Sequence, residues 1–354
     1  MNMPSDGGLR IAFVGAGAIG GYVGGHLAKA GMNVVLIDQW AEHVEAMNRH
    51  GLRFSGTLGE YTVPVRALHI SDVQSLVREP IDIAFVCVKL YDTAWATTLI
   101  KEYLAPDGYV VTMQNSVVEP LVADIVGWGR TMGCIASTMS AEAYAPGRIV
   151  RTRQPGGAAY TIFRAGETHG RVTPRLTQLV ELLGLVDSAK ATTNLWGERW
   201  GKLVANTMTT GVSGVTGMSL MDVIKDVSLR PLLVRLGAEA IRIGHAQGYA
   251  IEPVRRLEST VWLDADRGDR AALVQVNDAF GVELERMTDA GFSGTAQDLR
   301  KNRRTEIDYM NGYVARQGQE IGIPAPTHAA LTALVHRMER GELAPHRTSV
   351  SALM

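Results

Sequence analysis

The residues best suited to chemistry in this sequence are the closely spaced glycines near its start. They follow a short apolar run from Ile11 and precede a helical pattern, in the order Gly15, Ala16, Gly17, Ala18, Ile19 and Gly20. In a strand–turn–helix unit the first glycine permits a tight turn, the second lets backbone amides approach a pyrophosphate, and the third lets the helix pack closely on the strand. The amides of the helix N-terminus also favour an anion. The spacing therefore predicts a dinucleotide site.

An acid stands where such a site meets the ribose. Asp38 ends the next apolar run, VVLID, and Gln39 and Trp40 after it offer no guanidinium for a phosphate. A carboxylate here accepts hydrogen bonds from the ribose 2′-OH and repels a 2′-phosphate, which favours NAD over NADP. The alternative role for Asp38 is that of a helix cap or a surface acid.

Two later apolar runs also lead into polar residues. Lys89 follows Ile81–Val88, and Asn115 follows Gly108–Met113. Residues just past the carboxyl ends of parallel strands line the crevice in which ligands bind. Lys89 and Asn115 are therefore candidate site residues, and the alternatives are a solvated lysine and an ordinary turn asparagine.

The second half of the chain offers acid–base candidates. Lys202 and Asn206 lie four residues apart, which places an ammonium and an amide on one helix face, where they could protonate and hold a substrate carbonyl. A surface lysine is the alternative. Thr305 and Asp308 form a capping-box pattern that predicts the start of a long helix, with Glu306 as an acid in its first turn.

Other chemistries find little support. The nine histidines form no cluster with each other or with Cys87 and Cys134, so we expect no metal site. No G-x-S-x-G nucleophile motif occurs. Cys87 lies within an apolar run and is expected in the core, and the sequence leaves open a single disulfide between the two cysteines.

The elements that must position these residues follow from periodicity. Alternating apolar runs and helical patterns predict an α/β fold with a largely parallel sheet, a Rossmann-type dinucleotide-binding domain over residues 1–192. Gly51–Leu68 resembles a hairpin held at an edge by Pro64, and RIVRT and AAYTIF are expected to be antiparallel strands on the far side of the same sheet. From 193 to 354 helical periodicity dominates and predicts an all-helical domain, with long helices over 195–209, 228–247, 270–288, 306–321 and 327–340. Gly248, Gly322 and Gly341 suit the ends of three of them.

Composition limits the class of protein. The chain has 354 residues, 46% of them hydrophobic and 20% charged, with a formal net charge of −1. Without an excess of cations, a nucleic-acid or anionic-membrane partner is not expected. The short polar start predicts no signal peptide, no apolar run is long enough to span a bilayer, and two cysteines suit a reducing compartment, so we expect a cytoplasmic protein.

Several motifs in this order and spacing resemble the ketopantoate reductase family: GAGAIGG, VKLYD, QNS, WGKLVAN and TEIDYMNGY. The resemblance extends from about Ile11 to about Arg340. It implies a Rossmann domain followed by a helical domain, substrate bound between them, and a homodimer. It also implies that Lys202 is the general acid and that Glu306 binds the substrate hydroxyl. Asn115 and Asn206 then orient the substrate and the lysine, and Lys89 contacts the cofactor.

The sequence departs from the family pattern at several of these positions. Asp38 stands where a basic residue usually holds the NADP 2′-phosphate, and Ser116 replaces a glycine after the family's asparagine. Thr210 replaces a second asparagine on the lysine helix, and the family's substrate-carboxylate serine falls at Ser293 or Gly294. We therefore expect an NAD(P)H-dependent reductase of a 2-oxo acid, with NAD favoured and ketopantoate itself in doubt. The alternatives are a catalytically idle NAD-binding sensor and an imine- or opine-type reductase.

Overall fold

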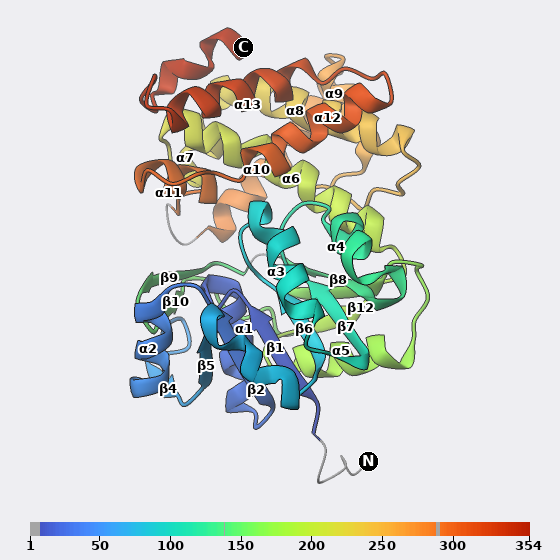
Figure 1. Ribbon diagram of the computed structural model, residues 1–354. Helices are drawn as coiled ribbons and strands as arrows, with labels where there is room; N and C mark the ends of the chain where they lie inside the picture. Colours follow the sequence, from blue (N-terminus) through green and yellow to red (C-terminus); the bar gives the residue numbers. More distant parts are fainter. Residues whose placement is uncertain (1–7, 138, 288–290) are drawn as a thin grey trace. The chain divides into compact units, whose positions relative to one another are not determined.

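The computed structural model describes residues 8–137, 139–287 and 291–354. Their contacts divide the chain into two compact units, Met1–Leu195 and Trp196–Met354. The division lies just beyond the boundary expected from the sequence. Each unit is described by itself, and Figure 1 shows the first in blue to green and the second in yellow-green to red.

The N-terminal unit is built on an eight-stranded sheet with the order β12-β11-β8-β7-β6-β1-β2-β5. All neighbouring strands are parallel except β11 and β8, which are antiparallel. The strands are β1 (Arg10–Val14), β2 (Asn33–Asp38), β5 (Arg66–His69), β6 (Ile81–Val86), β7 (Leu104–Thr112), β8 (Thr131–Ala136), β11 (Phe163–Glu167) and β12 (Ala189–Ala191). The expected α/β architecture is confirmed.

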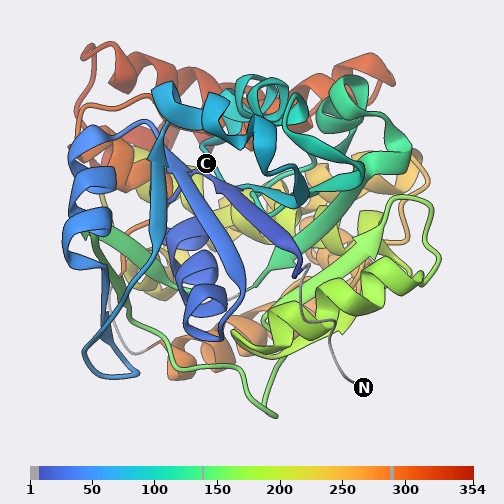
Figure 2. The same ribbon diagram turned by 60° about the horizontal axis from the view of Figure 1, so that its bottom comes forward.

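Both faces of this sheet are covered, which is why its central strands are mainly apolar. On one face Ile11 and Phe13 join a core with helices α1 (Ala18–Lys29), α2 (Ala41–His50) and α5 (Pro174–Gly184). On the other face Ala12 and Val14 join a core with η1 (Ile70–Arg78), α3 (Thr93–Lys101) and α4 (Glu119–Val126). Figure 2 shows the sheet between these helices. The short 3-10 turns in this unit are η2 (Leu90–Asp92) and η3 (Trp128–Arg130).

A second, four-stranded sheet has the order β4-β3-β10-β9. It contains β3 (Leu52–Gly56), β4 (Tyr61–Val63), β9 (Ala141–Ala145) and β10 (Arg148–Arg151). The expected hairpin is confirmed, because β3 and β4 are antiparallel and β4 is an edge strand. The placement of RIVRT in the main sheet is wrong, because β10 pairs parallel to β3 and antiparallel to β9. AAYTIF lies almost wholly before β11, which begins at Phe163 and pairs antiparallel with β8 of the main sheet.

The C-terminal unit is helical in its described residues. Its elements are α6 (Leu195–Thr216), α7 (Leu220–Lys225), η4 (Val227–Leu229), α8 (Arg230–Ala246), α9 (Ser259–Asp266), α10 (Arg270–Arg286), α11 (Gly294–Arg300), η5 (Ile307–Tyr309), α12 (Asn311–Glu320), α13 (Pro326–Glu339) and η6 (Arg347–Leu353). Gly248, Gly322 and Gly341 take positive φ just after α8, α12 and α13, as expected. No helix in the described ranges is long and apolar enough to cross a membrane.

The expected helix over 306–321 is partly wrong. Residues 307–309 form only a 3-10 turn, and Met310, with φ −111° and ψ −98°, separates that turn from α12. The capping box is also wrong. The Thr305 hydroxyl accepts from the Ile307 amide, whereas the Asp308 carboxylate lies 2.8 Å from Nε2 of His336.

Candidate active site

The glycine turn joins β1 to α1 and has the geometry that a dinucleotide site needs. Gly15 has φ +97°, and a Cβ there would lie 2.8 Å from the backbone of Cys87. A Cβ on Gly20 would lie 2.0 Å from the carbonyl oxygen of Gly15. Both positions therefore require glycine, one for the turn and one for close helix packing.

Gly17 differs from the other two glycines because no atom of the described residues lies within 4 Å of where its Cβ would be. It is the N-cap residue of α1, no side chain caps this helix, and its first turn carries no acid. The first amides of a helix have no partner within the helix and attract an anion. The residues present therefore fit the pyrophosphate of a dinucleotide.

Asp38 closes this turn from the end of β2. Its Oδ2 accepts from the Ala16 amide at 2.8 Å, and its Oδ1 accepts from the Trp40 amide at 2.9 Å. A carboxylate has about four acceptor positions, so two remain for the hydroxyls of a ribose. Asp38 is not the cap of α2, since that position belongs to Trp40.

A histidine that the sequence did not single out supports the same turn. His43 is 1% exposed, its Nδ1 accepts from the Gly147 amide at 2.9 Å, and its Nε2 lies 3.0 Å from the Ala16 carbonyl oxygen. The ring is therefore neutral, with its proton on Nε2. Its ring stacks on the indole of Trp40, with centroids 5.2 Å apart. Only its position in the helix after Asp38 could have suggested this role.

The strand ends that carry Lys89 and Asn115 are joined by a glutamine. Gln114 donates through Nε2 to the Val88 carbonyl at 2.8 Å and to the Thr93 hydroxyl at 2.9 Å. Lys89 precedes η2, and both Lys89 and Asn115 are half-buried. The structure thus brings these two candidates to neighbouring strands, β6 and β7, at the carboxyl edge of the sheet.

Ser116 has an unusual backbone. Its φ is +64°, in the left-handed region, and the residue is 4% exposed. A non-glycine residue in this conformation is strained by about 1 kcal/mol or more. The strain occurs directly beside Asn115, where such outliers often accompany a binding function.

The cysteines do not serve as nucleophiles in this arrangement. Neither cysteine forms a disulfide with another of the described residues, and burial raises the pKa of Cys87, so its thiol stays protonated. The Cβ of Cys87 instead packs where a Cβ on Gly20 would lie. In the described part of the chain no group of three metal-binding side chains occurs.

The acid–base candidates lie in the C-terminal unit, on α6. Lys202, Asn206 and Thr210 follow one another at four-residue spacing and are all half-buried. They therefore form one stripe along the helix. The hydroxyl of Thr210 is buried and has no hydrogen-bond partner among the residues that the structure describes, so the stripe ends in a polar atom that a ligand could satisfy.

Ser293 and Gly294 lie against the same helix. The Ser293 hydroxyl donates to the Thr210 carbonyl at 2.9 Å and accepts from the Ala296 amide at 3.1 Å, which makes it the cap of α11. Ser293 is 3% exposed, whereas Gly294 is exposed and open where a Cβ would be. Ser293 therefore has a structural role beside Thr210.

Glu306 is half-buried at the start of η5. The residues after it pack on α6: Ile307 lies against Gly211, and Asn311 donates to the Thr207 carbonyl at 3.0 Å. The structure thus places Glu306 on a segment anchored to the helix that carries Lys202. Asn311 and its neighbour His328 were not predicted, because both are buried within the helices.

Comparisons with known proteins agree with this architecture. The family described as ketopantoate reductase PanE/ApbA matches residues 11–162, and its C-terminal counterpart matches residues 194–339. A 2-dehydropantoate 2-reductase from Mesorhizobium japonicum is 28% identical over 94% of this chain and 99% of its own. One from Archaeoglobus fulgidus is 26% identical over 94% and 98%.

Solved structures show the same likeness. A PanE/ApbA family ketopantoate reductase from Ralstonia eutropha has a TM-score of 0.77 and 25% identity, covering 94% of this chain and 99% of that one. A D-mandelate dehydrogenase with NADH and anilino(oxo)acetate has a TM-score of 0.79 at 20% identity with the same coverage, and shares the fold. With both family segments matched in order, the chain belongs to the ketopantoate reductase family, which consists of NAD(P)-dependent oxidoreductases.

Proposed function

We propose that the chain reduces a 2-oxo acid to a 2-hydroxy acid and prefers NADH. The observation that carries the cofactor preference is Asp38, whose carboxylate accepts from the Ala16 amide of the glycine turn and from the Trp40 amide. A 2′-phosphate would lie against this negative charge, whereas ribose hydroxyls could donate to it. The likeness to 2-dehydropantoate 2-reductases supports the reaction type.

In this proposal the bound nicotinamide supplies the hydride, and residues of α6 handle the proton. Lys202 gives its Nζ proton to the carbonyl oxygen of the substrate as negative charge develops there. Asn206 holds the substrate in line, and the Thr210 hydroxyl supplies a further hydrogen bond. Glu306 accepts from a hydroxyl or other donor on the substrate. Asn115, Lys89 and residues 15–20 hold the cofactor.

The substrate proposed is a 2-oxo acid other than ketopantoate. The Ser293 hydroxyl already donates to the Thr210 carbonyl and caps α11, which leaves it less able to bind a substrate carboxylate. Thr210 and Ser116 further change the polar groups expected in the family. We also propose a homodimer, as the dimeric ketopantoate reductase from Staphylococcus aureus suggests by its shared fold. The two cysteines in 354 residues support a reducing, cytoplasmic location.

Initial rates with NADH and NADPH at equal concentration test the proposal, first with ketopantoate and then with branched and aromatic 2-oxo acids. We expect turnover of at least one acid, faster with NADH. Asp38→Asn should lower the ratio of kcat/KM with NADH to kcat/KM with NADPH by about tenfold or more. The substitution removes the repulsion between the carboxylate and the 2′-phosphate of NADPH, which is worth about 1.4 kcal/mol or more. Faster turnover of ketopantoate with NADPH would overturn the cofactor assignment. Tight NADH binding without turnover of any acid would favour the sensor.

A further inference from the structure

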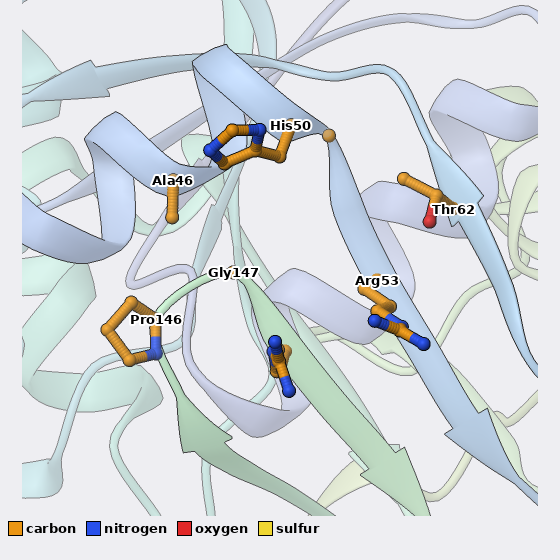
Figure 3. Close-up of a pocket in the computed structure, with 8 residues that line it drawn as sticks. Ala46, His50, Arg53, Thr62, Pro146 and Gly147 are labelled. Carbon is orange, nitrogen blue, oxygen red and sulfur yellow. The ribbon is translucent and has the colours of Figure 1, made fainter.

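A pocket lies in the N-terminal unit beside the second sheet. It has a volume of about 290 Å³ and is lined by Ala46, His50, Gly51, Arg53, Thr62, Pro146, Gly147 and Arg148. Figure 3 shows His50 at the end of α2, Arg53 and Thr62 on adjoining strands, and Pro146 and Gly147 on the turn before β10. None of these residues belongs to the glycine turn or to the α6 stripe.

Two arginines stand side by side in this pocket. Arg53 of β3 is the register partner of Arg148 of β10, and both side chains are exposed while their neighbours Phe54 and Ile149 are buried. On the other side Arg53 faces Thr62 of β4. The sheet therefore presents two guanidinium groups and a hydroxyl in one row. Like charges at adjacent positions of a sheet repel one another unless an anion lies between them.

The protein itself balances only part of this charge. Arg53 pairs with Glu60 at 2.9 Å, and the carbonyl end of α2, which finishes at His50, contributes partial negative charge. Arg148 makes no side-chain hydrogen bond or ion pair with any of the described residues. One guanidinium group that lines the pocket, that of Arg148, is thus left for a ligand.

The backbone keeps the pocket open. Gly51 and Gly147 have φ of +76° and +63°, a conformation that favours glycine. A Cβ on Gly51 would lie 2.8 Å from Cγ2 of Thr62, and one on Gly147 would lie 3.1 Å from Cβ of Ala46. Side chains at these positions would narrow the space between α2 and the two strands.

We propose that this pocket binds the phosphate group of a small molecule. Arginine pairs bind phosphate oxygens through several N–H groups at once, and the Thr62 hydroxyl can add a further donor. A volume of about 290 Å³ exceeds what a free phosphate ion needs, so a phosphorylated small molecule fits better than the ion alone.

Occupancy of the pocket is connected to the glycine turn through His43. Gly147, in the pocket wall, donates to His43 Nδ1, and Nε2 of the same ring donates to the carbonyl of Ala16. A ligand held by Arg148 would act on the turn that carries Gly147, and so on the position of Ala16. This step rests on the proposed cofactor site. We infer that binding in the pocket changes the affinity for NADH, and by reciprocity NADH changes the affinity of the pocket.

Calorimetric titration of the full chain with inorganic phosphate and with glycerol 2-phosphate, in low-salt buffer free of phosphate, tests the site. We expect saturable binding, tighter for glycerol 2-phosphate. Arg148→Gln should weaken it at least tenfold. Arg66→Gln, which changes an exposed arginine outside the pocket, should leave it within twofold. Because Arg148 is exposed, the variant should fold, which its thermal melt checks.

Two results would overturn the phosphate site, and a third would overturn its connection to the cofactor site. No saturable binding removes the site. Binding that survives Arg148→Gln but is displaced by NADH would locate the phosphate at the glycine turn instead. Binding in the pocket that leaves the NADH dissociation constant unchanged would remove the connection through His43. If NADH itself fails to bind, the proposed function is wrong, while the titration with phosphate still tests the pocket.

Discussion

Lys202 is the side chain on which the proposed chemistry depends most directly. It is half-buried on α6, in line with Asn206 and Thr210. Replacing it with alanine removes the proton donor, and a positioned acid contributes roughly 10²- to 10⁴-fold to a rate. We expect Lys202→Ala to lower kcat by about that factor while the NADH dissociation constant, measured by fluorescence titration, changes little. Lys225→Ala, at an exposed position of α7, is the matched control. Loss of NADH affinity with kcat intact would contradict the assigned role.

Ser116 allows a test of backbone strain beside the site. At φ +64° an alanine is as strained as a serine, whereas a glycine is not. Ser116→Gly and Ser116→Ala both lose the hydroxyl, so their difference isolates the backbone. We expect the glycine variant to unfold at higher urea than the alanine variant, by about 1 kcal/mol in the free energy of unfolding. Equal stabilities would mean that the left-handed conformation is not retained in the alanine variant.

The sequence predicted some residues of the candidate site well and others not at all. The glycine turn was predictable because glycines at this spacing indicate a tight turn and close helix packing. The structure shows that Gly15 and Gly20 have no room for a Cβ. His43 was not, because its partners, Ala16 and Gly147, come together only when the second sheet forms beside α2. Long-range contacts of this kind leave no local pattern to detect.

At the scale of elements, periodicity predicted the helices better than their ends. The helix from Leu195 was expected to stop at Thr209. The residues after it, TGVSGVT, are rich in glycine and β-branched residues, which are weak helix formers. In the structure this helix, α6, continues to Thr216. A Cβ on Gly211 would lie 2.9 Å from Leu331, and one on Gly214 would lie 2.6 Å from Thr295. Close packing of the neighbouring segments against these glycines thus stabilises a helix that propensity alone disfavours.

The second sheet was missed for a related reason. Alternating polar and apolar residues in β3 and β10 predict strands but not which strands pair. The two paired segments, Leu52–Gly56 and Arg148–Arg151, lie far apart in the sequence. A buried ion pair links β10 to the segment before β12 of the main sheet. Arg151 donates to Asp187 at 2.6 Å, and both side chains are 1% exposed. The guanidinium also donates to the hydroxyl of Tyr22 on α1 at 3.0 Å.

This ion pair provides an element-scale prediction. Removing one partner of a buried pair leaves an uncompensated charge and costs about 3–5 kcal/mol. We expect Asp187→Ala to lower the free energy of unfolding in urea by that amount. Glu79→Ala breaks an exposed pair, Arg66–Glu79, and should cost about 1 kcal/mol or less. Similar losses in the two variants would show that Asp187 contributes little beyond a surface pair.

At the scale of the whole molecule, each unit has its own core and its own buried histidine with a lowered pKa. In the N-terminal unit burial lowers the pKa of His26, whose ring lies between the Tyr22 carbonyl and the Tyr61 hydroxyl. In the C-terminal unit burial lowers the pKa of His328 to about 4, and its Nε2 donates to the Leu236 carbonyl at 2.8 Å. Both rings are neutral in the folded state, so acid should weaken both units.

His328 allows the direction and size of this effect to be worked out. Its pKa is about 6.5 when unfolded and about 4 when folded, so between these values the unfolded chain binds more protons. The contribution of neutral His328 to the free energy of unfolding is therefore fully present above about pH 6.5 and is lost as the pH falls toward 4. Between pH 7 and pH 5 the loss amounts to about 2 kcal/mol. Burial raises the pKa of the neighbouring Glu239, which acts in the opposite sense over its own range.

A comparison of variants separates the effect of His328 on stability from that of Glu239. His328→Gln keeps a donor for the Leu236 carbonyl but cannot be protonated, so its stability should fall less between pH 7 and pH 5 than that of the natural chain, by about 2 kcal/mol. Urea unfolding followed by tryptophan fluorescence, to which Trp200 and Trp262 of the C-terminal unit contribute from buried positions, measures this difference. His245→Gln, an exposed change on α8, should behave as the natural chain does. Equal pH dependence in all three proteins would mean that His328 accepts its proton without unfolding the helices around it.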